Sequence, residues 1–435
     1  MHKKLAPTPP MGWNSWDCYG AAVNEEQLLA NADYMAEHLK DYGWEYVVCD
    51  IQWSEPTANS FYYHYFAPLC MDEFSRLIPS VERFPSSADG KGFKPIADYI
   101  HSLGLKFGIH IMRGIPRQAA HQHTKIKCEG VTANDIAKPS FVCLWNPDMY
   151  GVDPDAKGGQ EYYDSIFELY ASWGVDYIKC DDIANIEIFP HNPYAARREI
   201  EMIRKAIDKC GRDMVLSLSP GPAPVEEHEH LAKNANLWRM TGDFWDEWEK
   251  LHAMFERCYA WQEYVQPGAW PDCDMLPLGR IQKTEELEKY RNRYTRFTHD
   301  EQITMMTLWG IFRSPLMMGG EMRENDEFTL SLLQNRELID MLKNSSGARQ
   351  FKREEIDGKG EIIWTSKGEN CKYVALFNTD DKEREISFDV TDIAVGGVKY
   401  SVWDMWSHNE YTVTTAEFSA KVNSHGARLF KITIK

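Results

Sequence analysis

The stretch Gln160–Asp182, QEYYDSIFELYASWGVDYIKCDD, contains the pattern that decides the fold. Residues 160–173 carry apolar side chains with helical periodicity, Gly174 is suited to end a helix, and the mostly apolar run Val175–Ile178 is typical of a buried strand. The same succession of helix, glycine and strand occurs three more times, at residues 24–49, 95–109 and 195–218. Helices that alternate with apolar strands predict a parallel sheet covered by helices.

The unit at residues 24–49 shows the signals most completely. Asn24 is followed three positions later by Gln27, which predicts a capping box at the start of a helix. Gly43 is expected to end that helix, and the run Tyr46–Cys49 to form the following strand. Each local signal therefore agrees with the periodicity.

Four further strand candidates bring the total to eight, and they are Met11–Trp13, Asn236–Trp238, Ala269–Trp270 and Ile311–Met317. Eight strands alternating with helices predict a (β/α)₈ TIM barrel over residues 1–346. An open doubly wound sheet is the alternative, but no G-x-G-x-x-G motif follows the first strand. Residues 112–160 are interpreted as a functional or lid-like insertion. Arg113 lies in it, either against substrate or, as we favour, in solvent.

The chain changes character after Gly347. Short β-rich segments separated by turn residues follow, at Glu361–Thr365, Lys372–Phe377, Glu385–Val390, Lys399–Trp403 and Arg428–Ile434. This pattern predicts a small antiparallel β-sandwich domain over residues 347–435. Support of the barrel is its favoured role, with carbohydrate binding as the alternative.

The amino-acid composition limits the classes of molecule that the protein is expected to bind. The chain has 435 residues, of which 43% are hydrophobic, and its formal net charge is −18. Such a charge repels nucleic acid and anionic membranes, so we expect neither of them as a partner. A small neutral or cationic molecule is the expected partner. Aromatic residues make up 13% of the chain, which is explained either by core packing or by sugar binding. Assembly into a homo-oligomer stays open.

The ten cysteines contain no C-x-x-C pair, and several lie in apolar runs. Free thiols in a reducing compartment are therefore expected. The first residues show no signal-peptide pattern, and no apolar run is long enough to span a membrane. A cytoplasmic protein is the resulting expectation.

Carboxylates gather at the predicted strand ends, where barrels keep their active sites. They are Asp50, Asp181, Asp182, Asp243, Asp272 and Asp274. Such a set forms a structural ion-pair ring, a glycosidase pair or a metal site. Lys179 and Arg239 beside it disfavour a metal, and the His121/His123 and Glu226–His230 segments lack zinc-site spacing. No metal or cofactor is expected.

Several motifs together resemble glycoside hydrolase family 27, the α-galactosidase and α-N-acetylgalactosaminidase family. They run from Pro9 to the C-terminus and comprise PPMGWNSW at 9–16, Asp50 with Trp53, Lys179-Cys180-Asp181, Arg239 to Asp243, WPDCDM at 270–275, RSPL at 313–316 and His425-Gly426. Each motif is weak alone, but their order and spacing are specific.

The resemblance implies a retaining exo-α-glycosidase for terminal galactose-type sugars, acting by double displacement. Asp181 would be the nucleophile, with Asp182 as its rival, and Asp243 the general acid/base, which calls for burial or nearby negative charge. Carboxyl groups about 5–5.5 Å apart are then expected. Substrate-binding residues implied in the same way are Trp16, Asp50, Trp53, Lys179, Ser219, Arg239 and Asp274, the last of which is alternatively structural. His110, at the end of a predicted strand, is a further candidate for substrate binding, with a core histidine as the alternative.

The chain departs from the family pattern at three points. Ile51 replaces the second of two hydroxyl-binding acids, and His110 replaces a tyrosine. Ser219 resembles the α-N-acetylgalactosaminidase branch, where a small residue accommodates a 2-acetamido group. An α-N-acetylgalactosaminidase and a β-L-arabinopyranosidase are therefore alternatives within the class. A catalytically silent carbohydrate-binding protein is the alternative from another class.

Overall fold

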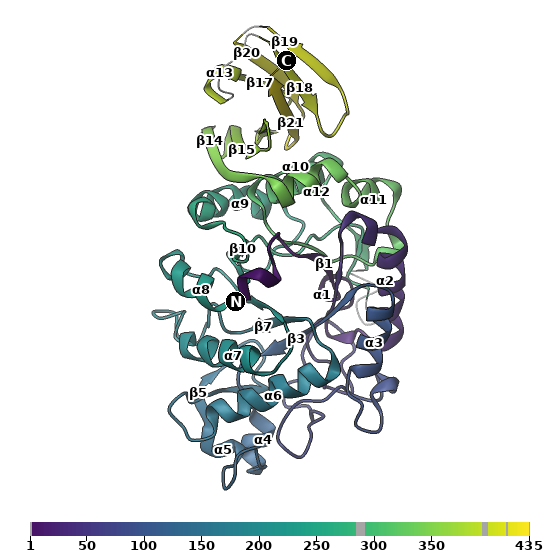
Figure 1. Cartoon of the computed structure of the whole chain (residues 1–435), viewed down its shortest axis with the longest axis vertical. Coiled ribbons are helices and arrows are strands. Elements are labelled where there is room, and N and C mark those ends of the chain that lie inside the picture. Colours follow the sequence, from purple (N-terminus) through teal and green to yellow (C-terminus); the bar gives the residue numbers. More distant parts are fainter. Residues whose placement is uncertain (1, 284–291, 394–398, 415, 435) are drawn as a thin grey trace.

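The computed structural model describes residues 2–283, 292–393, 399–414 and 416–434. A barrel of parallel strands surrounded by helices forms the larger part, and an antiparallel β domain stands next to α10 (His299–Phe312) and α12 (Arg336–Asn344) (Figure 1). The predicted fold class is thereby confirmed. The predicted domain boundary between residues 346 and 347 stays a prediction, although the antiparallel sheet begins at Ser346.

Eight parallel strands form the barrel sheet in the order β10-β9-β8-β7-β3-β2-β1-β13. Their bounds are β1 Met11–Asn14, β2 Tyr46–Cys49, β3 Lys106–Met112, β7 Tyr177–Asp181, β8 Val215–Leu218, β9 Leu237–Arg239, β10 Trp270–Asp272 and β13 Leu316–Met318. The two ends of the sheet meet because Leu276, just after β10, pairs in parallel with Met318 of β13. All eight carboxyl ends consequently surround one mouth.

The helices around the barrel begin and end largely where the local signals place them. The exception is the expected end at Gly43, because α2 already ends at His38 and Gly43 instead ends a short 3-10 helix, Lys40–Tyr42. Asn24 and Gln27 form the predicted capping box at the start of α2, and Gly174 takes a left-handed conformation (φ 85°) directly after α6. The main barrel helices are α2 Glu25–His38, α3 Lys94–Ser102, α6 Gly159–Trp173, α7 Arg197–Lys209, α8 His228–Asn234, α9 Trp248–Trp261 and α11 Glu327–Leu333, with α10 and α12. A short helix α1, Trp16–Tyr19, follows the first strand.

The predicted strand Ile311–Met317 is wrong at its start. Ile311 and Phe312 are the last residues of α10, which is buried on nearly every side. A helix buried all round has no polar face, so its apolar end cannot be distinguished by pattern from the strand that follows. Arg313, in a left-handed conformation (φ 71°), separates helix from strand.

The segment after β3 is an ordered subdomain. Antiparallel strands β4 (Ile115–Pro116), β6 (Met149–Val152) and β5 (Ala137–Val142) pack with α4 (Arg117–Gln122) and α5 (Ala133–Ile136). Our placement of Arg113 in solvent is wrong, because its side chain is only 1% exposed. The reason is a pair of buried acids, Asp182 and Glu199, which lie within 4 Å of its guanidinium group.

The C-terminal domain consists of a six-stranded sheet, β14-β15-β16-β21-β18-β19, and the pair β17-β20. The bounds are β14 Ser346–Ile356, β15 Lys359–Gly368, β16 Cys371–Asn378, β17 Arg384–Asp389, β18 Tyr400–Asp404, β19 Glu410–Val413, β20 Glu417–Val422 and β21 Ala427–Ile434, with α13 at Val390–Ile393. The sequence patterns miss β14, β19 and β20, because these strands are charged and at least half of their residues are not buried.

The ten cysteines are free thiols, as expected from their spacing. Among the described residues, no helix combines the length and apolarity that a membrane span requires. Within the same residues, no three His, Cys, Asp or Glu side chains are grouped as metal ligands.

Candidate active site

A cavity of about 510 Å³ opens at the carboxyl ends of the barrel strands. Its charged lining consists of Asp17, Asp50, Lys179, Asp181, Glu187, Arg239, Asp243 and Asp274. Its aromatic lining consists of Trp16, Phe61, Tyr63, Trp145, Phe244 and Trp245. The structure therefore brings both proposed catalytic aspartates to one hollow, together with five of the eight predicted substrate-binding residues.

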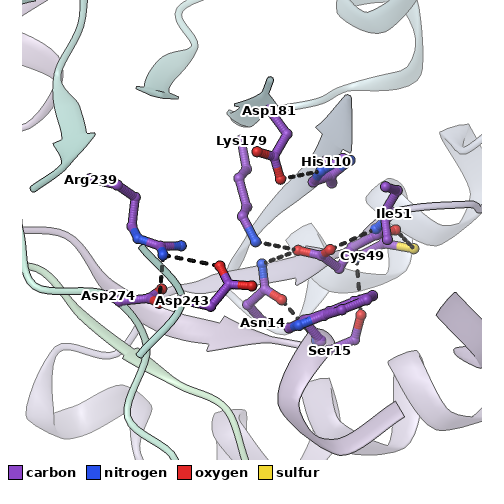
Figure 2. Close-up of polar contacts among 12 residues, drawn as sticks. Asn14, Ser15, Cys49, Ile51, His110, Lys179, Asp181, Arg239, Asp243 and Asp274 are labelled. Atoms are coloured by element: carbon purple, nitrogen blue, oxygen red, sulfur yellow. Dashed lines mark hydrogen bonds and ion pairs between the residues drawn. The ribbon is translucent and has the colours of Figure 1, made fainter. Parts of the chain in front are cut away.

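Asp181 is the last residue of β7 and faces this cavity (Figure 2). Its Oδ2 lies 3.0 Å from Nε2 of His110, and its Oδ1 accepts a hydrogen bond of 3.0 Å from the backbone N–H of Asp182. Burial by itself would raise the pKa of Asp181. The His110 contact, the Lys179 charge and the Asp182 amide outweigh it and hold that pKa well below its usual range. Asp181 is therefore ionised at any ordinary pH, as a nucleophilic carboxylate must be.

Asp50 and Lys179 form a buried ion pair of 2.8 Å on the wall beside Asp181 (Figure 2). Asn14 donates a second hydrogen bond of 2.8 Å to the same Asp50 oxygen, and the backbone N–H of Ile51 donates to the other oxygen. Burial would raise the pKa of Asp50, but Lys179, His110 and the Ile51 amide outweigh it and lower that pKa. Two charged groups are therefore held in fixed positions on this wall, and both can form strong hydrogen bonds to a polar ligand.

Arg239, at the end of β9, contacts two further acids of the cavity, Asp243 and Asp274. Its Nη2 lies 2.9 Å from Oδ2 of Asp274 and 3.2 Å from Oδ1 of Asp243 (Figure 2). Asp274 also accepts a hydrogen bond of 2.9 Å from the backbone N–H of Phe244, so it both lines the cavity and holds the loop that carries Asp243. The burial that the sequence led us to expect at Asp243 is absent, because its side chain is 65% exposed. The expected nearby acid is Asp274, which contacts the same Arg239 nitrogen.

Asp182, the rival of Asp181, points the other way. Its carboxylate lies 2.8 Å from Nη2 of Arg113, and both side chains are buried behind the cavity wall. Asp182 has a left-handed backbone (φ 53°), which turns the chain directly after the strand. Asp182 does not belong to the cavity lining, so of the two adjacent acids only Asp181 faces the substrate space.

Three predicted substrate-binding residues lie outside the lining. Trp53 is buried, and its indole N–H donates a 2.7 Å hydrogen bond to the backbone carbonyl of His110. His110 itself lies behind Asp181 and contacts it. Ser219 is buried, whereas the next three residues, Pro220, Gly221 and Pro222, form the wall.

Sequence reasoning missed Asp17 and most of the aromatic lining. Burial, followed by the charge of Asp274, raises the pKa of Asp17 well above its usual range. Its position soon after the first predicted strand was a usable signal, because the other cavity acids follow strands in the same way. Phe61 and Tyr63 come from a long loop with no periodicity, so no sequence signal indicated them. Trp145 lies in the insertion at residues 112–160, whose length was the only signal for it.

The comparisons with known proteins agree with this geometry. The family described as "Alpha galactosidase A" matches residues 8–138 and 154–344. The family described as "Alpha galactosidase C-terminal beta sandwich domain" matches residues 359–432. An α-galactosidase of Cyamopsis tetragonoloba is 27% identical over 432 residues, covering 99% of this chain and 87% of its own length.

Two solved structures are more similar in sequence. A family 27 β-L-arabinopyranosidase from Geobacillus stearothermophilus is 54% identical, with a TM-score of 0.95 and coverage of 99% of this chain and 98% of its own. A putative α-N-acetylgalactosaminidase from Bacillus halodurans is 48% identical, with a TM-score of 0.87 and coverage of 98% and 97%.

The family matches cover both parts of the chain, and the cavity contains the charged residues that the family motifs predict. A small carbohydrate is the substrate that such enzymes take. The chain belongs to glycoside hydrolase family 27, the α-galactosidase family, and is a glycoside hydrolase.

Proposed function

We propose that this enzyme is a retaining exo-glycosidase that removes terminal sugars of the galactose ring configuration, with β-L-arabinopyranose as the preferred sugar. The observation that carries the choice of sugar is Ile51, an apolar side chain in the cavity lining next to the charged Asp50. Substrate specificity is the difference between transition-state affinities for competing sugars, so an unpaired hydroxyl at one wall position has a large effect.

The chemistry follows from the two sides of the cavity. The ionised Asp181 attacks the anomeric carbon, and Asp243 protonates the departing glycosidic oxygen. A covalent glycosyl-aspartate results. Water then attacks its anomeric carbon while Asp243 takes a proton from that water, and the ester bond to Asp181 breaks to release the sugar and restore the carboxylate. The exposure of Asp243 suits this role, because the leaving group and the incoming water share the solvent side of the cavity. The separation of about 5–5.5 Å between the two carboxyl groups stays a prediction.

The choice of sugar depends on the inability of the Ile51 side chain to form hydrogen bonds. β-L-Arabinopyranose has the ring configuration of α-D-galactopyranose, with hydrogen in place of the hydroxymethyl group on C5. A sugar hydroxyl placed against Ile51 loses its hydrogen bonds to water and gains none, which costs about 1–3 kcal/mol. We infer that the hydroxymethyl group on C5 of a galactoside is the group placed against Ile51. β-L-Arabinopyranose lacks that group and avoids this cost. The 54% identity to an arabinopyranosidase supports the same sugar.

α-N-Acetylgalactosaminide is a weaker candidate. Its support was a small residue at position 219 with space for the acetamido group, and Ser219 is buried outside the cavity lining. The wall there consists of Pro220, Gly221 and Pro222. α-Galactoside remains the second substrate, because Asp50 and Lys179, two residues that the family motifs assign to hydroxyl binding, are both present and paired.

The substrate test compares kcat/KM on the 4-nitrophenyl glycosides of β-L-arabinopyranose, α-galactose and α-N-acetylgalactosamine. We expect the arabinopyranoside to exceed the galactoside by about 10- to 200-fold, the usual effect of one small group in a pocket. Ile51→Asp should shift the ratio at least about tenfold toward galactoside, and the apolar control Ile51→Val should leave it unchanged. A wild type that prefers galactoside, with a ratio that Ile51→Asp does not alter, rules out arabinopyranose as the preferred sugar.

The stereochemical test is separate from the choice of sugar. NMR of the first product before mutarotation should show the anomeric configuration of the substrate. Appearance of the opposite anomer first would mean a single displacement, and would contradict the covalent step at Asp181.

A further inference from the structure

A second cavity, of about 610 Å³, lies where the barrel meets the β domain. Its barrel wall includes Gln262 and Arg313, and its other wall consists of residues of β14, β15, β16 and α13. Gln262 also accepts a hydrogen bond of 2.9 Å from the backbone N–H of Gln350 in β14, which joins the two walls. Arg313 precedes β13, so this cavity is at the amino-terminal end of the strands, and it shares no lining residue with the active site.

Four cationic side chains line this cavity: Arg313, Arg349, Lys367 and Lys372. Within the part of the chain that the structure describes, none of them forms an ion pair, and two acids, Glu263 and Asp392, complete the charged lining. Burial, then the charges of Lys367 and Arg349, lower the pKa of Lys372. In a chain of net charge −18, this is a local excess of positive charge that repels itself.

Arg313 is held rigidly on the deep side of the cavity. Its side chain donates hydrogen bonds of 2.8 Å to the backbone carbonyls of Leu342 and Lys343, and its guanidinium carbon lies 4.8 Å from the Trp270 ring. The residue is only 7% exposed, and burial lowers its pKa to about 10 with no acid to offset the effect. A buried cation without an anion is costly unless something else supplies the negative charge.

A buried hydroxyl completes the donor set. Ser366 is 1% exposed, and its Oγ has no hydrogen-bond partner in the described residues, although Ser366 lines the cavity. The pairing of β14 with β15 is irregular opposite it, between Ser346 and Arg349, where Gly347 has a left-handed backbone (φ 59°). The irregular pairing and the unsatisfied hydroxyl thus lie side by side in the cavity lining.

We propose that this cavity is a binding site for a phosphate-bearing small molecule. Fixed and mobile cations together with a free hydroxyl are the groups that hold phosphate oxygens in proteins. The anion would neutralise the repulsion between Lys367, Lys372 and Arg349 and would pair the buried Arg313. The volume of the cavity exceeds that of inorganic phosphate, so a phosphate ester fits as well. A bound anion contacts both barrel and β domain and stabilises their junction.

The test uses the full-length enzyme and isothermal titration with inorganic phosphate and with glucose 6-phosphate, at constant ionic strength set with chloride. We expect saturable binding that weakens at least about tenfold in Lys367→Gln/Lys372→Gln, the loss of one to two charged hydrogen bonds. The matched control, Lys157→Gln/Lys205→Gln, removes the same charge from two exposed lysines elsewhere. It should bind as the wild type does, and all three proteins should keep the same kcat/KM.

The outcomes separate cleanly. Tighter binding of the ester than of inorganic phosphate identifies an ester as the ligand, and equal binding identifies the free ion. No saturable heat with either probe, or the same weakening in the control pair, overturns the proposal. A thermal-unfolding midpoint that rises with phosphate in the wild type and in the control, but not in the cavity variant, is the second expected readout.

Discussion

At the scale of single residues, Asp181 and Asp182 are adjacent in the chain but have different surroundings. Asp181 faces the active-site cavity, with its charge supported by His110 and Lys179. Asp182 faces the opposite way and pairs with the buried Arg113. Successive strand residues point to opposite sides, and the left-handed turn at Asp182 completes the separation. One carboxylate is available for chemistry, and the other holds the wall behind it.

Neutral replacements should separate these two roles. Asp181→Asn should lower kcat by at least about 10³-fold with little change in stability, because it removes the attacking group. Asp182→Asn should keep most of its kcat per folded molecule but lower the free energy of unfolding by about 3 kcal/mol, because Arg113 loses a buried partner. Kinetics on a chromogenic glycoside and urea unfolding measure the two effects. Equal losses of kcat in both variants would refute the division.

At the scale of elements, the loop after β8 fits tightly against the backbone after β9. A Cβ atom on Gly221 would lie 2.2 Å from the carbonyl oxygen of Thr241 and 2.6 Å from that of Arg239. Only a glycine permits this approach, since backbone oxygens cannot rotate away as a side chain does. The same contact positions the segment Arg239–Asp243, which carries the proposed acid/base. The position of the loop after β8 therefore determines the position of the loop after β9, which forms another part of the cavity wall.

A single methyl group should disturb this contact. Gly221→Ala should lower the free energy of unfolding by about 1–3 kcal/mol, the range for overpacking, because the loop and the β9 end must move apart. Gly242→Ala is the matched control on the same cavity, since a Cβ atom added there would have no neighbour within 4 Å. Thermal unfolding of both variants measures the difference. A Gly221→Ala protein as stable as Gly242→Ala would show that the two loops are not in tight contact in solution.

At the scale of the whole molecule, polar contacts join the β domain to the barrel. The Glu355 carboxylate of β14 lies 2.7 Å from Nε2 of His252 on α9. Thr379 donates a hydrogen bond of 2.6 Å to the same carboxylate. His425 of the β domain stacks on Trp248, the first residue of α9, at 3.7 Å. Burial would raise the pKa of Glu355, but hydrogen bonds from His252, Thr379 and Arg353 outweigh it and hold that pKa at about 2. The domain interface is therefore stabilised by an ionised carboxylate.

This interface should weaken in acid. The folded-state pKa of Glu355 lies below its unfolded value of about 4.3, so its contribution is present above that value and declines as the pH falls toward 2. Glu355→Gln should lower the free energy of unfolding by about 2 kcal/mol at pH 7, and the difference from wild type should shrink below pH 4. Its exposed neighbour provides the control, since Glu354→Gln should change stability little at any pH. Urea unfolding across the pH series measures both; a pH-independent difference would contradict the linkage.

The sequence by itself determined the barrel and the acids at its mouth. The succession from Gln160 to Asp182 contains a helical period, a glycine stop and an apolar strand, and each of these signals acts over a few residues. Once the strands are parallel, the residues after them must meet at one end. That is why Asp50, Lys179, Asp181 and Arg239 were expected together, and the structure places all four in one lining.

Only the tertiary structure decided which polar groups are buried and what surrounds the sugar. Arg113 is buried because Glu199, 86 positions away in the chain, lies against it, and no local pattern shows such a partner. Trp145 and Tyr63 approach the same cavity from unrelated loops, and the cationic cavity at the domain junction unites Arg313 with Lys367. Periodicity is a property of neighbours along the chain, whereas burial and charge compensation depend on residues that meet only after folding.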